Sequence, residues 1–249
     1  MAGPETSEAP DLTVVIPVYN EEGRLSANLK LVLTTLKNLT GSFELIVVDD
    51  GSTDGTPGLV ERQLQDEPCA RLISYVPNRG KGYAVRTGIL QSSGERVIFL
   101  DADLSTPADE IPRALELLEG ADLVVGSRAL PDSRIAVRPP LYRRAATAVF
   151  ELVKHLLVDL WDISDTQCGF KAYRGAVARA LYRQAQVDRF MFDVEILYLA
   201  RQAGLKIVEM PVRWADVSGS KVRFLEGVVH MVRDLVRIRL LHRGVPRDT

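Results

Sequence analysis

Two groups of acidic residues are the strongest chemical signals in this sequence. The first lies in Asp49-Asp50-Gly51-Ser52-Thr53-Asp54 and the second is Asp101-Ala102-Asp103. Each group follows an apolar run that predicts a buried strand, so the carboxylates should lie at the strand ends where open α/β sheets bind ligands. There they can accept hydrogen bonds from a nucleotide or hold a divalent cation on a diphosphate. The pair predicts an enzyme that acts on a nucleotide-activated substrate.

The two groups suit different tasks. Asp49 lies in a turn of Asp, Gly and Ser residues, where it can accept from a base or a ribose hydroxyl; a turn that caps the next helix is the alternative. Asp101 and Asp103 are two positions apart and can bind one cation, with the diphosphate completing its ligand shell. Two acids that cap a helix are the alternative for this pair.

Two further loops contain residues that suit a nucleotide. Tyr19-Asn20-Glu21-Glu22 follows the first apolar run, where it can hold a base and ribose or cap a helix. Asn78-Arg79-Gly80-Lys81-Gly82 precedes a predicted helix, whose N–H groups and Lys81 can meet a phosphate. A plain glycine-rich turn is the alternative for this second loop.

These loops need strands and helices to position them. Buried strands are expected at 12–18, 43–48, 71–76, 96–100, 121–126, 168–173 and 205–212. Helical spacing predicts helices at 26–39, 56–65, 80–91, 109–118, 141–158, 192–203 and 224–241. Strands that alternate with helices favour βαβ units and a mostly parallel sheet in an α/β fold.

Composition limits the class of protein further. The chain has 249 residues, is 46% hydrophobic and has a formal net charge of -2, so it can build a large core and has no global field that attracts nucleic acid. Two cysteines do not form a disulfide framework, which favours a reducing compartment. We therefore expect a cytoplasmic protein that does not bind nucleic acid.

The ends of the chain suggest a domain with two appendages. Residues 1–10 are polar and lack the apolar stretch of a signal peptide, so they read as a disordered lead-in to a domain at 11–224. The most apolar segment, 145–161, contains Glu151, Lys154 and Asp159 and is a poor membrane span.

Residues 225–249 are predicted to form an amphipathic basic helix and tail. Its apolar stripe is Leu225, Val228, Val229, Val232, Leu235 and Val236, flanked by Arg233, Arg237, Arg239 and Arg243. Such a helix can lie on an anionic membrane, which predicts a peripheral protein on its cytoplasmic face. Packing on the core or in a homodimer interface is the alternative.

Taken together, the motifs resemble inverting glycosyltransferases of family 2. Pro17 to Glu22, the DDGSTDGT run, NRGKG, DAD and Gly126-Ser127-Arg128 occur in that family's order. Asp165-Thr166-Gln167-Cys168-Gly169-Phe170-Lys171 and Gly219-Ser220-Lys221 look like the dolichyl-phosphate β-glucosyltransferase branch. The resemblance covers about residues 12–224 and implies a GT-A-type, Rossmann-like sandwich with a mostly parallel central sheet.

The resemblance also implies roles for individual residues. The residues expected to bind the donor are Pro17, Tyr19, Glu21, Asp49, Lys81, Asp101 and Gln167. The residues expected to bind an acceptor phosphate are Arg128, Arg138, Arg143 and Lys221. Asp101 and Asp103 would hold Mg²⁺ or Mn²⁺, and Asp103, Arg128 and Asp165 would be the catalytic residues. A loop cap is the alternative for Asp165, and Cys168 reads as a packing residue.

The expected reaction is transfer of a sugar, glucose from UDP-glucose, to a polyprenyl or dolichyl phosphate. GDP-mannose as donor is one alternative. A soluble acceptor is another, and it would need a carboxylate base, for which Asp165 is the first candidate. A nucleotidyltransferase would need a basic glycine-rich loop after the first strand, where this chain has Glu21 and Glu22. A non-catalytic nucleotide-binding scaffold is disfavoured because both acidic groups are intact.

Overall fold

The fold is taken from a computed structural model that describes residues 9–39, 41–135, 154, 156–215 and 224–243. Predictions for Arg138, Arg143 and Lys221, and for most of the helix expected at 141–158, fall outside the described residues. So does the expected lead-in, apart from its last two residues. Pro10 is tied to the domain, because its carbonyl accepts a hydrogen bond of 2.9 Å from the Glu95 N–H.

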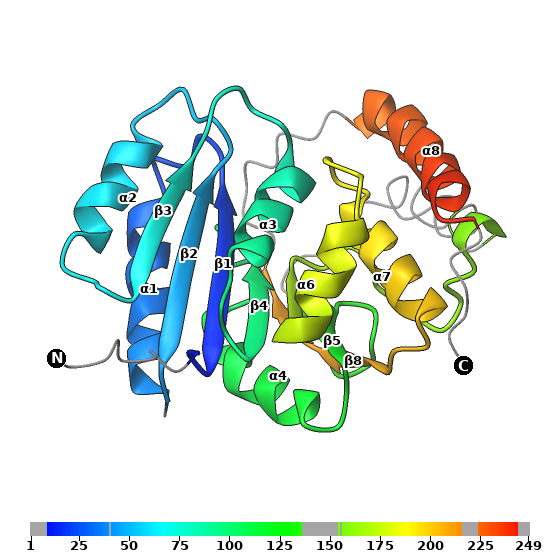
Figure 1. The fold of residues 1–249 in the computed structure, drawn as a ribbon, viewed down its shortest axis with the longest axis horizontal. Coiled ribbons are helices and arrows are strands. Elements are labelled where there is room, and N and C mark those ends of the chain that lie inside the picture. The colour runs from blue at the N-terminus through cyan, green and yellow to red at the C-terminus, as the bar shows by residue number, and fades with distance from the viewer. Residues whose placement is uncertain (1–8, 40, 136–153, 155, 216–223, 244–249) are drawn as a thin grey trace, which may run out of the picture.

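A seven-stranded sheet forms the centre of the molecule (Figure 1). Its order is β3-β2-β1-β4-β7-β5-β8, and every neighbouring pair is parallel except the two that involve β7. The strands are β1 (Leu12–Val18), β2 (Phe43–Asp49), β3 (Ala70–Ser74), β4 (Arg96–Leu100), β5 (Leu123–Ser127), β7 (Phe170–Arg174) and β8 (Ile207–Pro211). The expected mostly parallel α/β sheet is confirmed.

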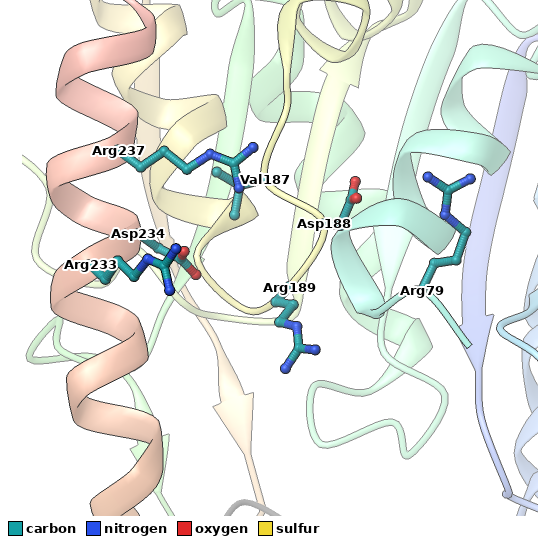
Figure 2. A pocket seen from close by; sticks show the side chains of 7 residues that line it. All are labelled: Arg79, Val187, Asp188, Arg189, Arg233, Asp234 and Arg237. Atoms are coloured by element: carbon teal, nitrogen blue, oxygen red, sulfur yellow. The ribbon is translucent and has the colours of Figure 1, made fainter. Parts of the chain in front are cut away.

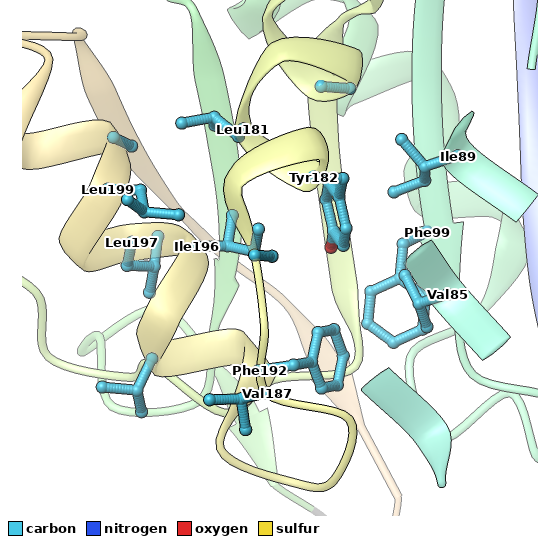
Figure 3. Packing of buried hydrophobic residues seen from close by; sticks show 14 of the residues in the cluster. Val85, Ile89, Phe99, Leu181, Tyr182, Val187, Phe192, Ile196, Leu197 and Leu199 are labelled. Carbon is cyan, nitrogen blue, oxygen red and sulfur yellow. The ribbon is translucent and has the colours of Figure 1, made fainter. Parts of the chain in front are cut away.

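Helices cover both faces of this sheet. The first face is covered by α3 (Lys81–Leu90), α6 (Gly175–Gln184), α7 (Phe192–Gln202) and α8 (Phe224–Leu241). The second is covered by α1 (Leu25–Asn38), α2 (Thr56–Leu64) and α4 (Ile111–Leu118), which follows the 3-10 turn η1 (Ala108–Glu110). Figure 3 shows the first core, where Phe99 of β4 packs against Phe192 of α7.

Burial on both faces explains the continuous apolar runs of the strands. In β1, Val15 enters the first core, whereas Val14 and Ile16 enter the second. Because successive side chains point to opposite faces, a strand covered on both sides favours apolar residues at successive positions. This is why the parallel strands could be recognised from the sequence.

Two features of the fold were not expected. Helix α6 was not predicted, although its buried residues Ala178, Leu181 and Tyr182 have the i, i+3, i+4 spacing of a helix. A small second sheet pairs β6 (Arg134–Ile135) with β9 (Arg213–Trp214). Strands of two residues carry no periodicity that a sequence can reveal.

Helix α8 packs on the core over its second half. Leu235 and Ile238 are fully buried against the first core, which supports the core-packing alternative for this part of the helix. Val236 and Leu240 are exposed, so the predicted apolar stripe is divided between the protein interior and the surface. Within the described part of the chain, no helix is long and apolar enough to cross a membrane.

Candidate active site

The carboxyl ends of β1, β2 and β4 bring the two acidic groups to one edge of the sheet. Val18 is paired with Asp49 in register, and the Asp50 N–H donates to the Val18 carbonyl at 2.9 Å. On the other side of β1, β4 runs parallel and leads directly into Asp101. Asp49 thus ends β2 and Asp101 follows β4, the two strands that flank β1, so both acids lie at one edge of the sheet, as the sequence predicted.

The loop after β1 is fastened to the loop after β2. The Asn20 N–H donates to Ser52 Oγ at 2.9 Å, and the Glu21 N–H donates to Thr56 Oγ1 at 2.9 Å. Tyr19 is 41% exposed at this edge, a value that leaves its ring accessible to a base. The Glu21 carboxylate forms an ion pair with Arg24, a side chain of the same loop.

The adjacent residues Asp49 and Asp50 have separate roles. Both are buried, and Asp49 accepts a hydrogen bond from the Ser52 N–H at 3.2 Å. Asp50 was given no role in the prediction, yet its carboxylate accepts from four donors at 2.7–2.8 Å. These donors are Tyr75 Oη, Asn78 Nδ2, the Arg79 N–H and the Gly80 N–H. Asp50 therefore fixes the loop that carries Lys81.

Lys81 bridges this loop to the second acidic group. Its Nζ lies 2.7 Å from Asp101 Oδ1. Burial alone would lower the pKa of Lys81, but the nearby carboxylates, Asp101 first and Asp193 next, raise it. Lys81 thus stays a cation at the start of α3, where a phosphate can be bound.

A buried ion pair that the prediction missed lies in the same charge network. Lys171 Nζ is 2.5 Å from Asp193 Oδ1, and it also donates to the Cys168 carbonyl at 2.8 Å. Burial raises the pKa of Asp193, against the attraction of Lys171 and Lys81. No spacing in the sequence signals this pair, because the partners come from β7 and α7.

Asp101 and Asp103 fit a hard divalent cation. Both are partly exposed, and Asp103 accepts a hydrogen bond from the Ser105 N–H at 2.9 Å. Gly169 lies against the Asp101 carboxylate and leaves no room for a Cβ. Among the described residues, no cluster of three or more His, Cys, Asp or Glu side chains could hold a metal alone. The two carboxylates thus suit Mg²⁺ or Mn²⁺ whose other ligands come from a diphosphate and water.

Arg128 and Asp165 form a partly buried ion pair beside these carboxylates. Arg128 Nε and Nη2 donate to the two Asp165 oxygens at 2.6 and 2.9 Å, and the Arg128 N–H also donates to Asp165 at 2.9 Å. Burial alone would raise the pKa of Asp165, but Arg128 outweighs it and the pKa is lowered. The charge of Asp101 also contributes to the raised pKa of Arg128. Asp165 is thus a partner of Arg128 and a weak candidate for a base.

The remaining predicted residues line or support this edge. Pro17 is buried within β1, and the Gln167 N–H donates to Asp165 at 3.2 Å, which places Gln167 beside the Arg128 pair. Cys168 is fully buried and burial raises the pKa of its thiol to about 11, which fits the predicted packing role. Trp214 lies 5.5 Å from the Arg128 guanidinium.

The edge of the sheet that carries Asp49, Asp101 and Asp103 is called the acidic edge below. This edge and the fold define a glycosyltransferase of the GT-A class. Glucosyl-3-phosphoglycerate synthase from Mycobacterium tuberculosis, solved with Mn²⁺, UDP and glucosyl-3-phosphoglycerate, has a TM-score of 0.64 at 23% identity over 96% of this chain and 82% of its own. A mannosyltransferase from Pyrobaculum calidifontis, solved with GDP-Man and Mn²⁺, has a TM-score of 0.59 at 23% identity over 86% of this chain and 59% of its own. At these identities the likeness shows the fold alone.

The chain belongs to glycosyltransferase family 2, as its motifs indicated. The sequence profile described as Glycosyl transferase family 2 matches residues 13–181. Dolichyl-phosphate beta-glucosyltransferase from Dictyostelium discoideum is 36% identical over 92% of this chain and 73% of its own length. The proteins of that name from Drosophila melanogaster and Saccharomyces cerevisiae are 37% and 32% identical, over 94% and 95% of this chain and 76% and 77% of their own lengths.

Proposed function

We propose that this enzyme transfers glucose from UDP-glucose to dolichyl phosphate or another polyprenyl phosphate, with inversion at the anomeric carbon. The named relatives, similar over nearly the whole chain, support glucose as the sugar and dolichyl phosphate as the acceptor. The observation that carries the proposal is the Arg128–Asp165 pair. It presents a fixed guanidinium on the acidic edge and leaves the predicted base engaged.

The nucleophile determines what the site must supply. A phosphate oxygen is anionic at neutral pH, so it needs no general base and must instead be placed beside the anomeric carbon. Arg128 suits this task, because a guanidinium binds phosphate oxygens through two parallel N–H donors. Asp165 acts as a positioning residue, since it accepts from Nε and Nη2 and so fixes the plane of the guanidinium.

The donor is assigned to the edge formed by β1, β2 and β4. Tyr19 and Asp49 face the nucleoside, and Lys81 faces the diphosphate at the start of α3. Asp101 and Asp103 hold a divalent cation, which when bound supplies positive charge to the departing diphosphate. Asp50 keeps Lys81 in place by ordering the preceding loop.

A double-mutant cycle on Arg128 and Asp165 tests their roles. Arg128→Ala is expected to lower kcat/KM for the lipid acceptor about a hundredfold, the typical loss on removing one charged donor from a site. Asp165→Asn should lower it less, and adding Asp165→Asn to Arg128→Ala should cost little more, because Asp165 acts through Arg128. Initial rates over an acceptor titration provide the measurement.

The same cycle separates the lipid acceptor from a soluble acceptor. A hydroxyl nucleophile needs Asp165 as an independent base, so the losses from the two substitutions would multiply. Arg213→Ala serves as a control, because Arg213 lies next to Trp214 but pairs with Glu110 at 2.7 Å. An unchanged acceptor titration for Arg128→Ala would remove Arg128 from the site.

A panel of radiolabelled donors tests the substrates directly. UDP-glucose and GDP-mannose would be supplied with a polyprenyl phosphate in detergent, and the product partitioned into organic solvent. Label from UDP-glucose should enter the organic phase, and polyprenol without its phosphate should accept none. Label that stays in water would contradict the lipid acceptor, and transfer from GDP-mannose alone would contradict the donor.

The acceptor implies that the enzyme works at a membrane surface, so we assign it a peripheral position on the cytoplasmic face. The exposed side chains Val236 and Leu240 of α8 support this position. A homodimer stays a prediction from the sequence.

A further inference from the structure

A pocket lined by arginines lies beside α8 (Figure 2). Its volume is about 450 Å³, and its four arginines are Arg79, Arg189, Arg233 and Arg237. Two aspartates, Asp188 and Asp234, also line it, so positive side chains outnumber negative ones in a protein with a net charge of -2. Such a local excess of guanidinium groups favours an anionic ligand.

The walls of the pocket come from distant parts of the chain. Arg233 and Arg237 are one turn apart on α8, and they face the loop of Val187, Asp188 and Arg189 between α6 and α7. Arg79 lies beyond Asp188, in the loop that leads to Lys81. The pocket thus spans from α8 to the loop assigned to the donor diphosphate.

One buried carboxylate holds both walls together. Glu195 Oε1 lies 2.8 Å from His242 Nε2, which follows the end of α8. The same carboxylate accepts from the Gln186 and Val187 N–H groups at 3.0 and 2.9 Å. Since α8 is also fixed by buried Leu235 and Ile238, the spacing of the walls is set by the core.

The arginines are not neutralised by the aspartate in the middle of the pocket. Asp188 is paired at 2.7 Å with Arg86, which does not line the pocket. The Arg79 guanidinium lies 3.6 Å from the Tyr83 ring centre, where stacking holds it without removing its charge. Arg189, Arg233 and Arg237 are exposed.

We propose that this pocket binds the phosphate of an anionic membrane lipid. Exposed apolar side chains lie next to the arginines in the chain: Phe190 follows Arg189, and Val236 and Leu240 flank Arg237 on α8. Such a mixture of apolar contacts and arginines is what a bilayer surface binds, with the guanidinium groups at the headgroup phosphates. This inference rests on the proposed function, which requires a membrane surface.

Vesicle co-sedimentation tests the proposal without any enzymatic reaction. Wild-type protein should bind vesicles of phosphatidylcholine with phosphatidylglycerol and bind pure phosphatidylcholine weakly. Arg233→Ala with Arg237→Ala should weaken binding to anionic vesicles about thirtyfold, since each arginine near such a surface contributes about fivefold. Arg62→Ala with Arg183→Ala removes the same charge from exposed positions outside the pocket and should leave binding unchanged.

A charge-preserving variant separates the pocket from general attraction. Arg233→Lys with Arg237→Lys keeps the net charge but loses the bidentate donors, so binding should fall about tenfold. Equal binding by this variant and the wild type would overturn the proposal. Melting curves show whether each variant is folded. Arg189→Ala gives an independent substitution on the opposite wall, with an expected loss of binding of about fivefold for its single arginine.

Inorganic phosphate without vesicles distinguishes the two sources of a phosphate group. If it raises the Tm of the wild type but not of the lysine variant, while all proteins bind vesicles equally, the occupant is a free anion and the lipid assignment is wrong. The vesicles contain no polyprenyl phosphate and no donor. Loss of the predicted vesicle binding would therefore not contradict the proposed glucosyl transfer, because that reaction is measured separately, in detergent, with the panel of donors.

Discussion

Asp103→Asn is expected to lower glucosyl transfer about a thousandfold or more. The substitution removes one of the two carboxylates assigned to the cation, whose charge contributes several kcal/mol to the departing diphosphate, and each 1.4 kcal/mol is about tenfold in rate. In the wild type the Ser105 N–H donates to Asp103 at 2.9 Å. The asparagine oxygen of the variant can accept the same hydrogen bond, so the fold should survive. Initial rates at saturating Mg²⁺ or Mn²⁺ and a thermal melt measure the two effects.

Asp66→Asn is the matched control for this experiment. Asp66 is exposed beyond the end of α2, so the same chemical change there should leave the rate and the Tm unchanged. Near-wild-type transfer by Asp103→Asn would reject the cation site. A large fall in Tm would instead assign Asp103 to the stability of its loop.

Gly169→Ala should damage the same site without removing a carboxylate. A Cβ at this position would lie 1.8 Å from Asp101 Oδ2 and 2.2 Å from its Cγ, distances that force the Asp101 side chain to move. We expect transfer to fall about a hundredfold, because misplacing a charged group by about 1 Å costs rates of this order. UDP binding in the absence of metal should change little, since Asp49 and the β1 loop are untouched.

Gly120→Ala provides the control for this glycine. The nearest atom to a Cβ there is the Leu117 carbonyl oxygen at 4.0 Å, so an added methyl group meets no obstacle. Calorimetric titration with UDP measures binding of the nucleotide. Initial rates at several metal concentrations measure the effect on the cation position at Asp101. Wild-type rates for Gly169→Ala at every metal concentration would show that the position of Asp101 does not matter for transfer.

The sheet could be predicted well from the sequence, because strands buried on both faces appear in it as runs of mostly apolar residues. Strands such as β1 and β2 are continuous apolar runs, and the acidic groups that follow them mark the ligand edge. The direction of β7 could not be predicted, because an apolar run carries no sign of whether its neighbours are parallel. The register shows that β7 is antiparallel to both neighbours: Arg96 pairs with Arg174 and Leu100 with Phe170, while Leu123 pairs with Tyr173 and Val125 with Lys171.

The site was predicted where its residues belong to motifs, and missed where partners meet only in three dimensions. Asp49 and Asp50 are adjacent, and nothing in the spacing tells which faces a ligand and which holds a loop. The four donors around its carboxylate show that Asp50 holds the loop. The Lys171–Asp193 pair and the arginines opposite α8 join elements far apart in the chain, so the sequence offered no signal for them.

The ion pair of Arg128 and Asp165 has a consequence for how this domain can change. Arg128 directly follows β5 and Asp165 precedes β7, so the ion pair joins the chain at these two points. The Arg128 N–H adds a hydrogen bond to the same carboxylate. The two ends of the stretch 129–164 are thereby fixed by the domain, whatever the stretch contains. Doubling the length of such a loop costs only about 0.6 kcal/mol. A change of length between these two ends is therefore tolerated, provided that the buried core residues Val158, Leu160 and Ile163 are kept.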